Sequence, residues 1–361
     1  MKIALHAPGF VKDGFDSPAR GEQRWSMNLA HYLGLAGHTI YLIGDMFYYN
    51  GKLVRPGWGN CPKVENVEIY TWTDRALLEE KFDIFMDTGW NKDIDDKRNL
   101  SIKSDIYISG FWGIDEQIKD PKGLVQSNKN HFYAYPTKRI IEIEDEIRRE
   151  YDTSKRLFLP IPLYDEWVEK ENDNLITWPL KECFYKDRGD SARRSKIILK
   201  AIKEITDKDS GAEVFFIGTN EFEYADKESR DILNEIKRKS SSDTQLPYNT
   251  CQKIISYTKL LTTNGSPPAG PIYLESVASG GVPICWGNSN HWGEDLIKLG
   301  YGLTENNPKE DDIMNFTLKL WNDKNFFSIV RNYMKDKASY YQVNSAIRQF
   351  SDEVFKVLER I

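Results

Sequence analysis

Hydrophobic and polar positions alternate near the N-terminus in a pattern that predicts two strands separated by a helix. The apolar runs KIALHA and TIYLIG each predict a buried strand. Between them, apolar side chains recur every four positions at Trp25, Leu29 and Leu33, which predicts the buried face of a helix. A strand, a helix and a strand within about forty residues form a βαβ unit, so we expect the strands to pair in parallel.

The same alternation continues along the chain. VEIYTW, FDIFMDTG and SDIYISG predict further strands, and KRIIEIEDEIRREY predicts an amphipathic helix. A second α/β pattern starts at NLITWPL (174–180), includes an apolar helix face in RRSKIILKAIKEI (193–205), and ends in a helical tail from Pro308 onward. We therefore expect two doubly wound, Rossmann-like domains facing a central cleft, with a boundary within 163–174. The expected domains, of which the second includes the C-terminal helices, are residues 1–168 and residues 169–361.

A short apolar helix in the second domain carries one acidic residue. In YLESVASGGVPICWG (273–287), apolar residues recur at i, i+3 and i+4 and predict a helix. Gly280 and Gly281 end this helix, because glycine tolerates the left-handed conformation of many helix ends. The loop before such a helix lies at the carboxyl edge of the sheet, where α/β domains bind ligands. Glu275 is therefore a candidate ligand contact.

The composition is typical of a globular protein and narrows the classes of function. At 361 residues the chain exceeds one ordinary core, which also favours two domains. The formal net charge of −6 offers no general attraction to nucleic acid or anionic lipid. Because no apolar run approaches the roughly 20 residues of a membrane span, we expect a cytoplasmic protein. Neither a disulfide framework nor a zinc site is indicated by the four scattered cysteines, Cys61, Cys183, Cys251 and Cys285.

A long loop, HAPGFVKDGFDSPARGEQRW, follows the first predicted strand. It exceeds the roughly two to six residues of most βα connections, and unusual length often marks function. Its glycines let the backbone approach a ligand, and the N-terminus of the next helix offers N–H groups to an anion. Gly21 and Arg24 are therefore candidates for contact with a phosphate, although a plain flexible loop is an alternative. The GxGxxG fingerprint of dehydrogenases does not occur here.

A cluster of cations precedes the first helix of the second domain. KECFYKDRGDSARRSK supplies Arg188, Arg194 and Lys196 among others. Guanidinium groups bind phosphate bidentately, and an adjoining helix N-terminus adds a favourable dipole, so this turn suits a diphosphate. A solvated charged turn is the alternative. Further along, FFIGTNEF ends a predicted strand at Gly218, where a base or ribose could lie against the backbone.

The order of these features resembles that of GT-B glycosyltransferases, in particular family 4-like members, which use nucleotide-sugar donors. RGEQRWSMNLAHYLGLAGHTIYLIG is similar to the family's GGxER…LA..L...GHEV opening, and GPIYLESVASGGVPICWG is similar to its FGxxxLEAMAxGxPVI segment. The resemblance covers most of the chain in outline and is close in those two segments. It implies the GT-B fold and transfer of a sugar from a nucleotide-diphosphate sugar, with a UDP-sugar as the expected donor, to an acceptor hydroxyl. It implies no metal and no further cofactor.

The resemblance also implies a role for individual residues of this chain that match functional positions of the family. Glu275 falls on the glutamate that accepts hydrogen bonds from the donor ribose, and a carboxylate suits paired hydroxyl donors. Gly270 falls on the glycine five residues earlier, and Gly21 on the second glycine of the first-domain loop. Many retaining members carry a second glutamate eight residues before the first, where this chain has Pro267. Retention of anomeric configuration is therefore not implied.

Catalysis in such a site needs charge stabilisation and, in an inverting enzyme, a base. Arg188 and Lys196 lie where the family keeps cations for the donor diphosphate, and Arg194 could replace either. Positioned cations and helix N-termini stabilise a leaving diphosphate without a metal. An inverting enzyme also needs a general base near the acceptor hydroxyl. The first-domain candidates, for which capping or core roles are the alternative, are Asp87, Asp115 and His6.

Two alternative functions stand beside the general one. YLESVASGGVPICW and SARRSKIILKAI also resemble bacteriophage enzymes that glucosylate hydroxymethylcytosine in DNA. In some of those enzymes an aspartate after a strand of the first domain is the base, whereas the comparable strand here ends in Ser109 and Gly110. The acceptor is thus either a glycan or other hydroxyl compound, or modified DNA. The second alternative is a noncatalytic protein that binds nucleotide sugars.

Overall fold

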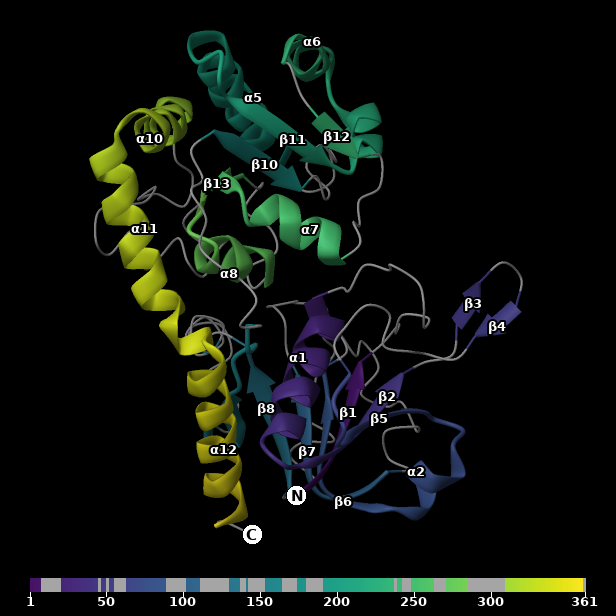
Figure 1. Cartoon of the computed structure of the whole chain (residues 1–361). Coiled ribbons are helices and arrows are strands. Elements are labelled where there is room, and N and C mark those ends of the chain that lie inside the picture. Colours follow the sequence, from purple (N-terminus) through teal and green to yellow (C-terminus); the bar gives the residue numbers. More distant parts are fainter. Residues whose placement is uncertain are drawn as a thin grey trace. The chain divides into compact units, whose positions relative to one another are not determined.

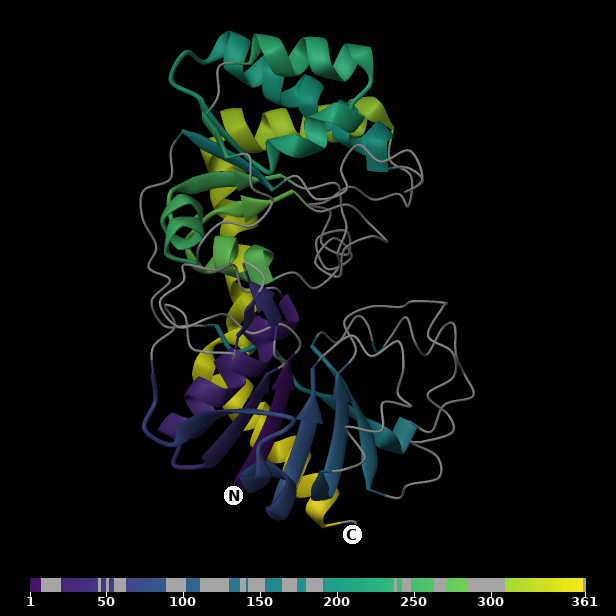
Figure 2. The ribbon, with the colours of Figure 1, turned by 90° about the vertical axis from the view of Figure 1, so that its right-hand side faces the viewer.

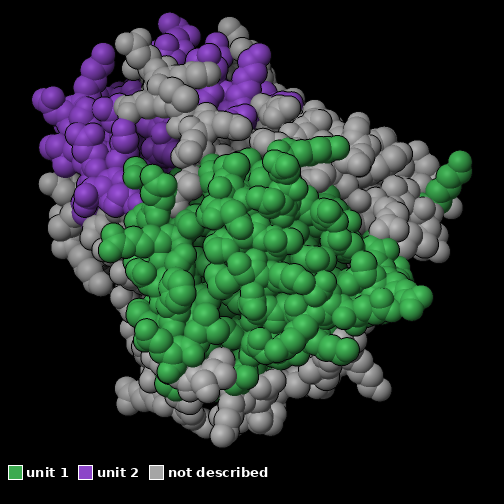
Figure 3. Space-filling model, turned by 60° about the horizontal axis from the view of Figure 1, so that its bottom comes forward, with its two compact units in different colours: residues 1–164, 340–361 green, residues 165–339 purple. Residues whose placement is uncertain are grey.

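The structure is a computed structural model of the whole chain (Figure 1). Its contacts divide the chain into two compact units, unit 1 (Met1–Tyr164 and Tyr340–Ile361) and unit 2 (Asp165–Ser339), which Figure 3 shows in different colours. Each unit is described by itself. The residues that the structure describes are 1–7, 21–44, 47–49, 52–54, 63–88, 102–110, 130–136, 141, 153–163, 174–179, 191–236, 239–241, 248–262, 271–284 and 309–359.

Unit 1 is built on a seven-stranded sheet, whose strands lie side by side in Figure 2. All its strand pairs are parallel, as the βαβ pattern predicts. A separate antiparallel hairpin joins β3 (Phe47–Tyr49) and β4 (Lys52–Val54). Across the sheet the order is β5 (Val67–Thr71), β2 (Thr39–Gly44), β1 (Lys2–Ala7), β6 (Lys81–Asp87), β7 (Lys103–Gly110), β8 (His131–Tyr135) and β9 (Arg156–Phe158).

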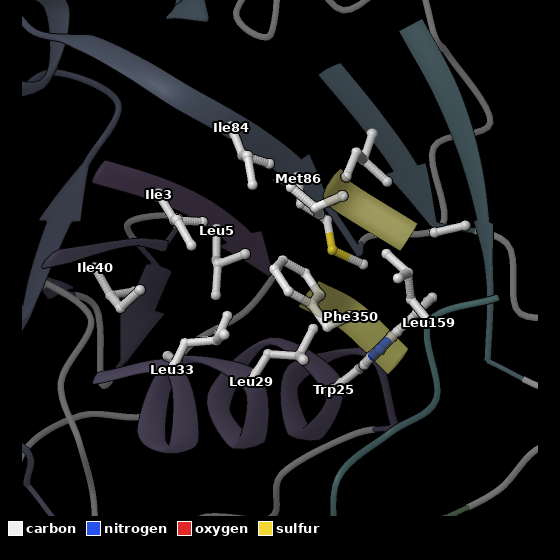
Figure 4. Close-up of a cluster of buried hydrophobic side chains, with 14 of the residues drawn as sticks. Ile3, Leu5, Trp25, Leu29, Leu33, Ile40, Ile84, Met86, Leu159 and Phe350 are labelled. Carbon is white, nitrogen blue, oxygen red and sulfur yellow. The ribbon is translucent and has the colours of Figure 1, made fainter. Parts of the chain in front are cut away.

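Helices α1 (Gly21–Leu35) and α12 (Val343–Leu358) contact each other and contribute to the main core of unit 1. The predicted helix face is confirmed, since Trp25, Leu29 and Leu33 are all fully buried in this core. They pack with Ile3, Leu5 and other strand residues that point to the same side (Figure 4). Burial of this face stabilises the helix against the sheet, because each large apolar side chain removed from water contributes roughly 1.5–3 kcal/mol.

A smaller apolar cluster is formed by the strand residues that alternate with those of the main core. Ala4, Ile43 and Phe85 pack there with Leu77 of the short helix α2 (Arg75–Glu79). Alternate residues of a strand point to opposite faces, so Ala4 and Ile3 enter different clusters. Both faces of the sheet are therefore apolar, as expected for parallel strands.

Unit 2 is built on a five-stranded parallel sheet. Its strands run in the order β12 (Lys239–Ser241), β11 (Glu213–Ile217), β10 (Leu175–Pro179), β13 (Thr258–Leu261) and β14 (Val282–Pro283). The helix face predicted in 193–205 is confirmed, because Ile198, Ala201 and Ile202 are fully buried. The helices are α5 (Ser191–Lys208), α6 (Lys227–Glu235), α7 (Tyr248–Ile255), α8 (Pro271–Ala278), α10 (Glu310–Asn322) and α11 (Lys324–Ala338), with the 3₁₀ helix η3 (Thr219–Tyr224).

The domain division differs from the expected one at the C-terminus. We expected residues 169–361 to form the second domain, but Tyr340–Ile361 belong to unit 1. The physical reason is the apolar face of α12, where Phe350 and Val354 are almost completely buried in the unit 1 core. In the sequence this face predicts only that the helix is buried, and both units offer an apolar partner.

Candidate functional site

Two of the three proposed bases lie together at the carboxyl edge of the unit 1 sheet. His6 of β1 and Asp87 of β6 are opposite each other in the parallel register. The His6 Nδ1 atom lies 2.9 Å from Asp87 Oδ1, and both residues are buried, at 5% and 3% exposure. A carboxylate next to one ring nitrogen orients the imidazole. The third candidate, Asp115, lies outside the described residues.

Hydrogen bonds to the backbone of His6 hold this edge in place. The Oγ atom of Ser26, on α1, donates to the carbonyl oxygen of His6 at 3.0 Å. The backbone N–H and the Oγ1 hydroxyl of Thr88 donate to the same oxygen, both at 3.1 Å. On its other side, the His6 ring lies against the Trp72 indole, with 4.7 Å between ring centroids. Contacts from α1, β6 and the end of β5 therefore position the imidazole.

A second polar pair extends the row across the sheet. Ser109 of β7 is opposite Asp87 in the register, so His6, Asp87 and Ser109 occupy three adjacent strands about 4.8 Å apart. The Oγ atom of Ser109 lies 2.8 Å from Nε2 of His131 on β8. Burial lowers the pKa of His131 to about 4, with a further contribution from the positive charge of Lys155. This imidazole is therefore neutral at neutral pH.

The glycine that ends β7 allows α1 to approach this edge. A Cβ atom on Gly110 would lie 2.8 Å from the Trp25 ring and 3.1 Å from the carbonyl oxygen of Asp87. These distances are too short for any side chain, so glycine is required here. Gly21 is the first residue of α1, which agrees with the predicted helix start. The structure describes the backbone of Arg24 on this helix but not its side chain.

The cation candidates of unit 2 lie at the start of α5, as the sequence predicts. Arg194 and Lys196 belong to its first two turns, whereas Arg188 lies outside the described residues. The Lys196 ammonium is ion-paired with Glu228 and lies 3.4 Å from Asp226, the N-cap of α6. The hydrogen bond with Glu228 raises the pKa of Lys196 above its ordinary value. In this structure its charge is thus compensated within unit 2.

Gly218 lies at a strand end of unit 2, and Glu275 lies on a helix of the same unit. Gly218 directly follows β11 and has a left-handed φ of 87°, a conformation that favours glycine. Glu275 is on α8, as predicted, and is buried at 3% exposure. Gly280 ends this helix with a φ of 86°, which confirms the predicted glycine stop. Gly270, which immediately precedes α8, lies outside the described residues.

The described residues hold no group of three or more His, Cys, Asp or Glu side chains that could bind a metal ion. Among the described helices, none has both the length and the apolar character needed to cross a membrane.

No protein-family model and no curated protein matches the chain. Solved structures, in contrast, match along its full length. Anabaena Alr3699/HepE in complex with UDP-glucose is 10% identical, with a TM-score of 0.63 and coverage of 100% of both chains. The pneumococcal O-GlcNAc transferase GtfA in complex with UDP and GlcNAc is 11% identical, with a TM-score of 0.63 and coverage of 99% of both chains. An α-glucosyltransferase in complex with UDP and DNA containing an HMU base is 10% identical, with a TM-score of 0.58 and coverage of 98% of this chain and 99% of that one.

The chain has the GT-B fold. Its two parallel sheets with flanking helices agree with this assignment, and so does the expectation from the two similar segments, 20–44 and 270–287. At such low identity the likeness establishes only the architecture. Any reaction has to be argued from the residues at the strand ends, because a shared fold does not imply a shared function.

Sequence reasoning identified His6 and Asp87 separately but missed their pairing, and it missed Ser26, Thr88 and His131 as neighbours. The sequence did contain a signal for these contacts. Carboxyl ends of adjacent parallel strands meet at one edge, so the polar residues that close β1, β6 and β7 were candidates for contact with one another.

Proposed function

We propose that the protein transfers a sugar from a nucleotide-diphosphate sugar, with UDP as the expected nucleotide, to an acceptor hydroxyl. The observation that carries this proposal is the full-length likeness to solved structures that hold UDP or UDP-glucose, one of which is an O-GlcNAc transferase. The expected donor residues support it, because those that are described lie on α5, after β11 and on α8. A cytoplasmic location is part of the same proposal.

In this proposal unit 2 binds the donor. Glu275 accepts hydrogen bonds from the ribose hydroxyls, and the backbone at Gly218 and Gly270 lies against the nucleoside. Arg188 and Arg194 stabilise the negative charge of the leaving diphosphate, together with the N-terminus of α5 and without a metal. Lys196 contributes only if it exchanges Glu228 for the diphosphate, so we rank it below the two arginines.

In the same proposal unit 1 binds the acceptor, and Gly21 and Arg24 of α1 are candidates for contact with a phosphate. The test uses a panel of UDP-, GDP- and ADP-sugars, with thermal shift to detect binding and product analysis to detect transfer. We expect a UDP-sugar to raise the melting temperature and to be consumed. Absence of both effects with every donor would contradict the proposal, and binding without turnover would instead support a noncatalytic nucleotide-sugar-binding protein.

Glu275→Gln tests the donor site directly. Loss of a charged acceptor that binds hydroxyl groups should weaken UDP-sugar binding by about 1.5–3 kcal/mol, or roughly 10- to 100-fold. Glu235→Gln is the matched control, because Glu235 is an exposed glutamate on α6 of the same unit. If the Glu275→Gln protein is less stable but binds UDP as the wild type does, Glu275 is not part of the donor site.

Modified DNA is the second candidate acceptor. The likeness to the α-glucosyltransferase bound to HMU-containing DNA supports it, whereas the net charge of −6 does not. Incubation with hydroxymethylated and unmodified duplexes distinguishes the two acceptor classes. Transfer to the hydroxymethylated duplex alone would establish DNA as the acceptor, and transfer only to small glycans would exclude it.

A further inference from the structure

The ion pairs of Lys196 bear on how tightly unit 2 binds its donor. We propose that the Glu228 carboxylate occupies the Lys196 ammonium in place of the donor diphosphate, so that donor binding requires an exchange of partners and Glu228 weakens it. This inference rests on the proposed function and deepens it, because it identifies a residue of unit 2 that opposes the donor and thereby sets its affinity.

Lys196 lies where the first turns of two helices meet. Helices α5 and α6 contact each other and follow β10 and β11, which are adjacent parallel strands, so both helices begin at the carboxyl edge of the sheet. The Lys196 ammonium of α5 contacts Glu228 in the first turn of α6 and Asp226 at its N-cap. Helix side chains lean towards the N-terminus, so this ammonium lies towards the start of α5, where the diphosphate is proposed to bind.

The two acids that contact Lys196 differ in how firmly they are held. Asp226 caps α6, since its Oδ1 accepts the backbone N–H of Ser229 at 2.7 Å while its Oδ2 lies 3.4 Å from the ammonium. Glu228 makes the closer contact with Lys196, and its side chain is 54% exposed. The hydrogen bond from Lys196 is also the largest cause that lowers the pKa of Glu228. Glu228 is therefore the charged partner that an incoming anion has to replace.

Lys200 offers Glu228 a second partner after such an exchange. Its Nζ lies 3.6 Å from Oε1 of Glu228, whereas Oε2 of the same carboxylate pairs with Lys196. Lys200 is one turn further along α5 and also donates to Glu310 of α10 at 2.8 Å. Release of Lys196 thus leaves Glu228 next to another cation, and exchange between exposed ion pairs costs little. A diphosphate carries more negative charge than one carboxylate, so it can displace Glu228.

The experiment compares the affinities of UDP and of uridine for the wild type and for Glu228→Gln by isothermal titration calorimetry. Gln removes the negative charge and nearly keeps the size of the side chain. Because an exposed ion pair changes an equilibrium constant by only a few-fold, Glu228→Gln should bind UDP about two- to fivefold more tightly than the wild type. Uridine lacks the diphosphate, so its affinity should be the same for both proteins.

Glu235→Gln is the matched control, because Glu235 of α6 pairs with Lys203 of α5 at 3.3 Å, two turns further from the start of α5 than Lys196. It should leave the affinity for UDP unchanged. A double-mutant cycle then tests the pair itself: in a Lys196→Met protein, Glu228→Gln should lose most of its effect on UDP binding.

Three results would overturn the inference and leave the donor site of the proposed function intact. The first is UDP binding by Glu228→Gln that is no tighter than that of the wild type. The second is an equal gain in affinity for uridine, and the third is the full gain for UDP in the Lys196→Met background. Absence of UDP binding by the wild type and by every variant would instead contradict the proposed function.

Discussion

The Oγ atom of Ser109 lies 2.8 Å from Nε2 of His131 on the adjacent strand, in a part of unit 1 where the imidazole is largely buried. The pKa of His131 is lowered from 6.5 to about 4, mainly by burial and also by Lys155. Because the folded-state pKa is the lower one, the stability that His131 contributes is fully present above pH 6.5. As the pH falls from 6.5 towards 4, the unfolded chain binds more protons and this stability is lost.

We therefore expect the free energy of unfolding to fall by roughly 2 kcal/mol more in the wild type than in His131→Gln between pH 7 and pH 4.5. Urea denaturation at a series of pH values measures the difference. Gln cannot titrate but keeps an amide near Ser109, so it isolates the effect of the proton. Parallel pH profiles for the two proteins would show that His131 is not the group responsible.

Phe350 of α12 should be essential to the stability of unit 1. It is fully buried, and its removal in Phe350→Ala leaves a cavity that should lower the free energy of unfolding by about 3–5 kcal/mol. Phe355→Ala, on the same helix but 56% exposed, should change it by less than about 0.5 kcal/mol. Hydrogen exchange of α1 should rise in Phe350→Ala only, and a change confined to unit 2 would argue against the observed division of the chain.

Lys259 is a buried cation that connects β13 with the end of α10. Its Nζ donates to the Trp321 carbonyl oxygen at 3.1 Å and lies 4.4 Å from the centroid of the Trp321 ring. Lys259→Met keeps the length of the side chain but removes this donor and the charge, so it should lower the free energy of unfolding by about 1–3 kcal/mol. The exposed Lys319, 4.2 Å from the Phe326 ring centroid, provides the control. Lys319→Met should have less than half of that effect in chemical denaturation.

Gly281 directly precedes β14 and leaves no space for a side chain. A Cβ atom there would lie 2.5 Å from the Thr258 carbonyl oxygen and 2.6 Å from the Ser276 hydroxyl. Gly281→Ala should therefore lower the free energy of unfolding by about 1–3 kcal/mol, because α8 must move away from β13. In Gly211→Ala the nearest atom is the Asp209 carboxylate oxygen at 3.3 Å, which needs to shift by only a few tenths of an ångström, so its melting temperature should change much less. Equal melting temperatures for both variants would contradict this explanation.

Local features of the chain were predictable from sequence. The apolar spacing of α1 and α5 predicted which faces are buried, since helix periodicity depends only on neighbouring residues. Gly280 predicted the end of α8 because a left-handed φ is a property of one residue. The candidate residues His6 and Asp87 were found in the same way, from their position at the ends of apolar runs.

Pairings between distant segments required the structure. The sequence does not indicate a partner for Lys196. In the structure Glu228 of α6 is its partner, although a strand and a 3₁₀ helix intervene between them along the chain. In the same way, 81 positions separate His6 from Asp87, and only the order of strands makes them neighbours.

The sequence by itself determined the α/β class, the two sheets, the faces of the main helices and the glycine at the end of α8, because these follow from periodicity and from the backbone preferences of single residues. Only the tertiary structure decided that α12 joins unit 1, that Lys196 is paired with acids of α6, and that an imidazole and a carboxylate meet at one strand edge. An apolar stripe or a charge predicts that a partner is needed, but the partner itself depends on which segments the whole chain brings together in space.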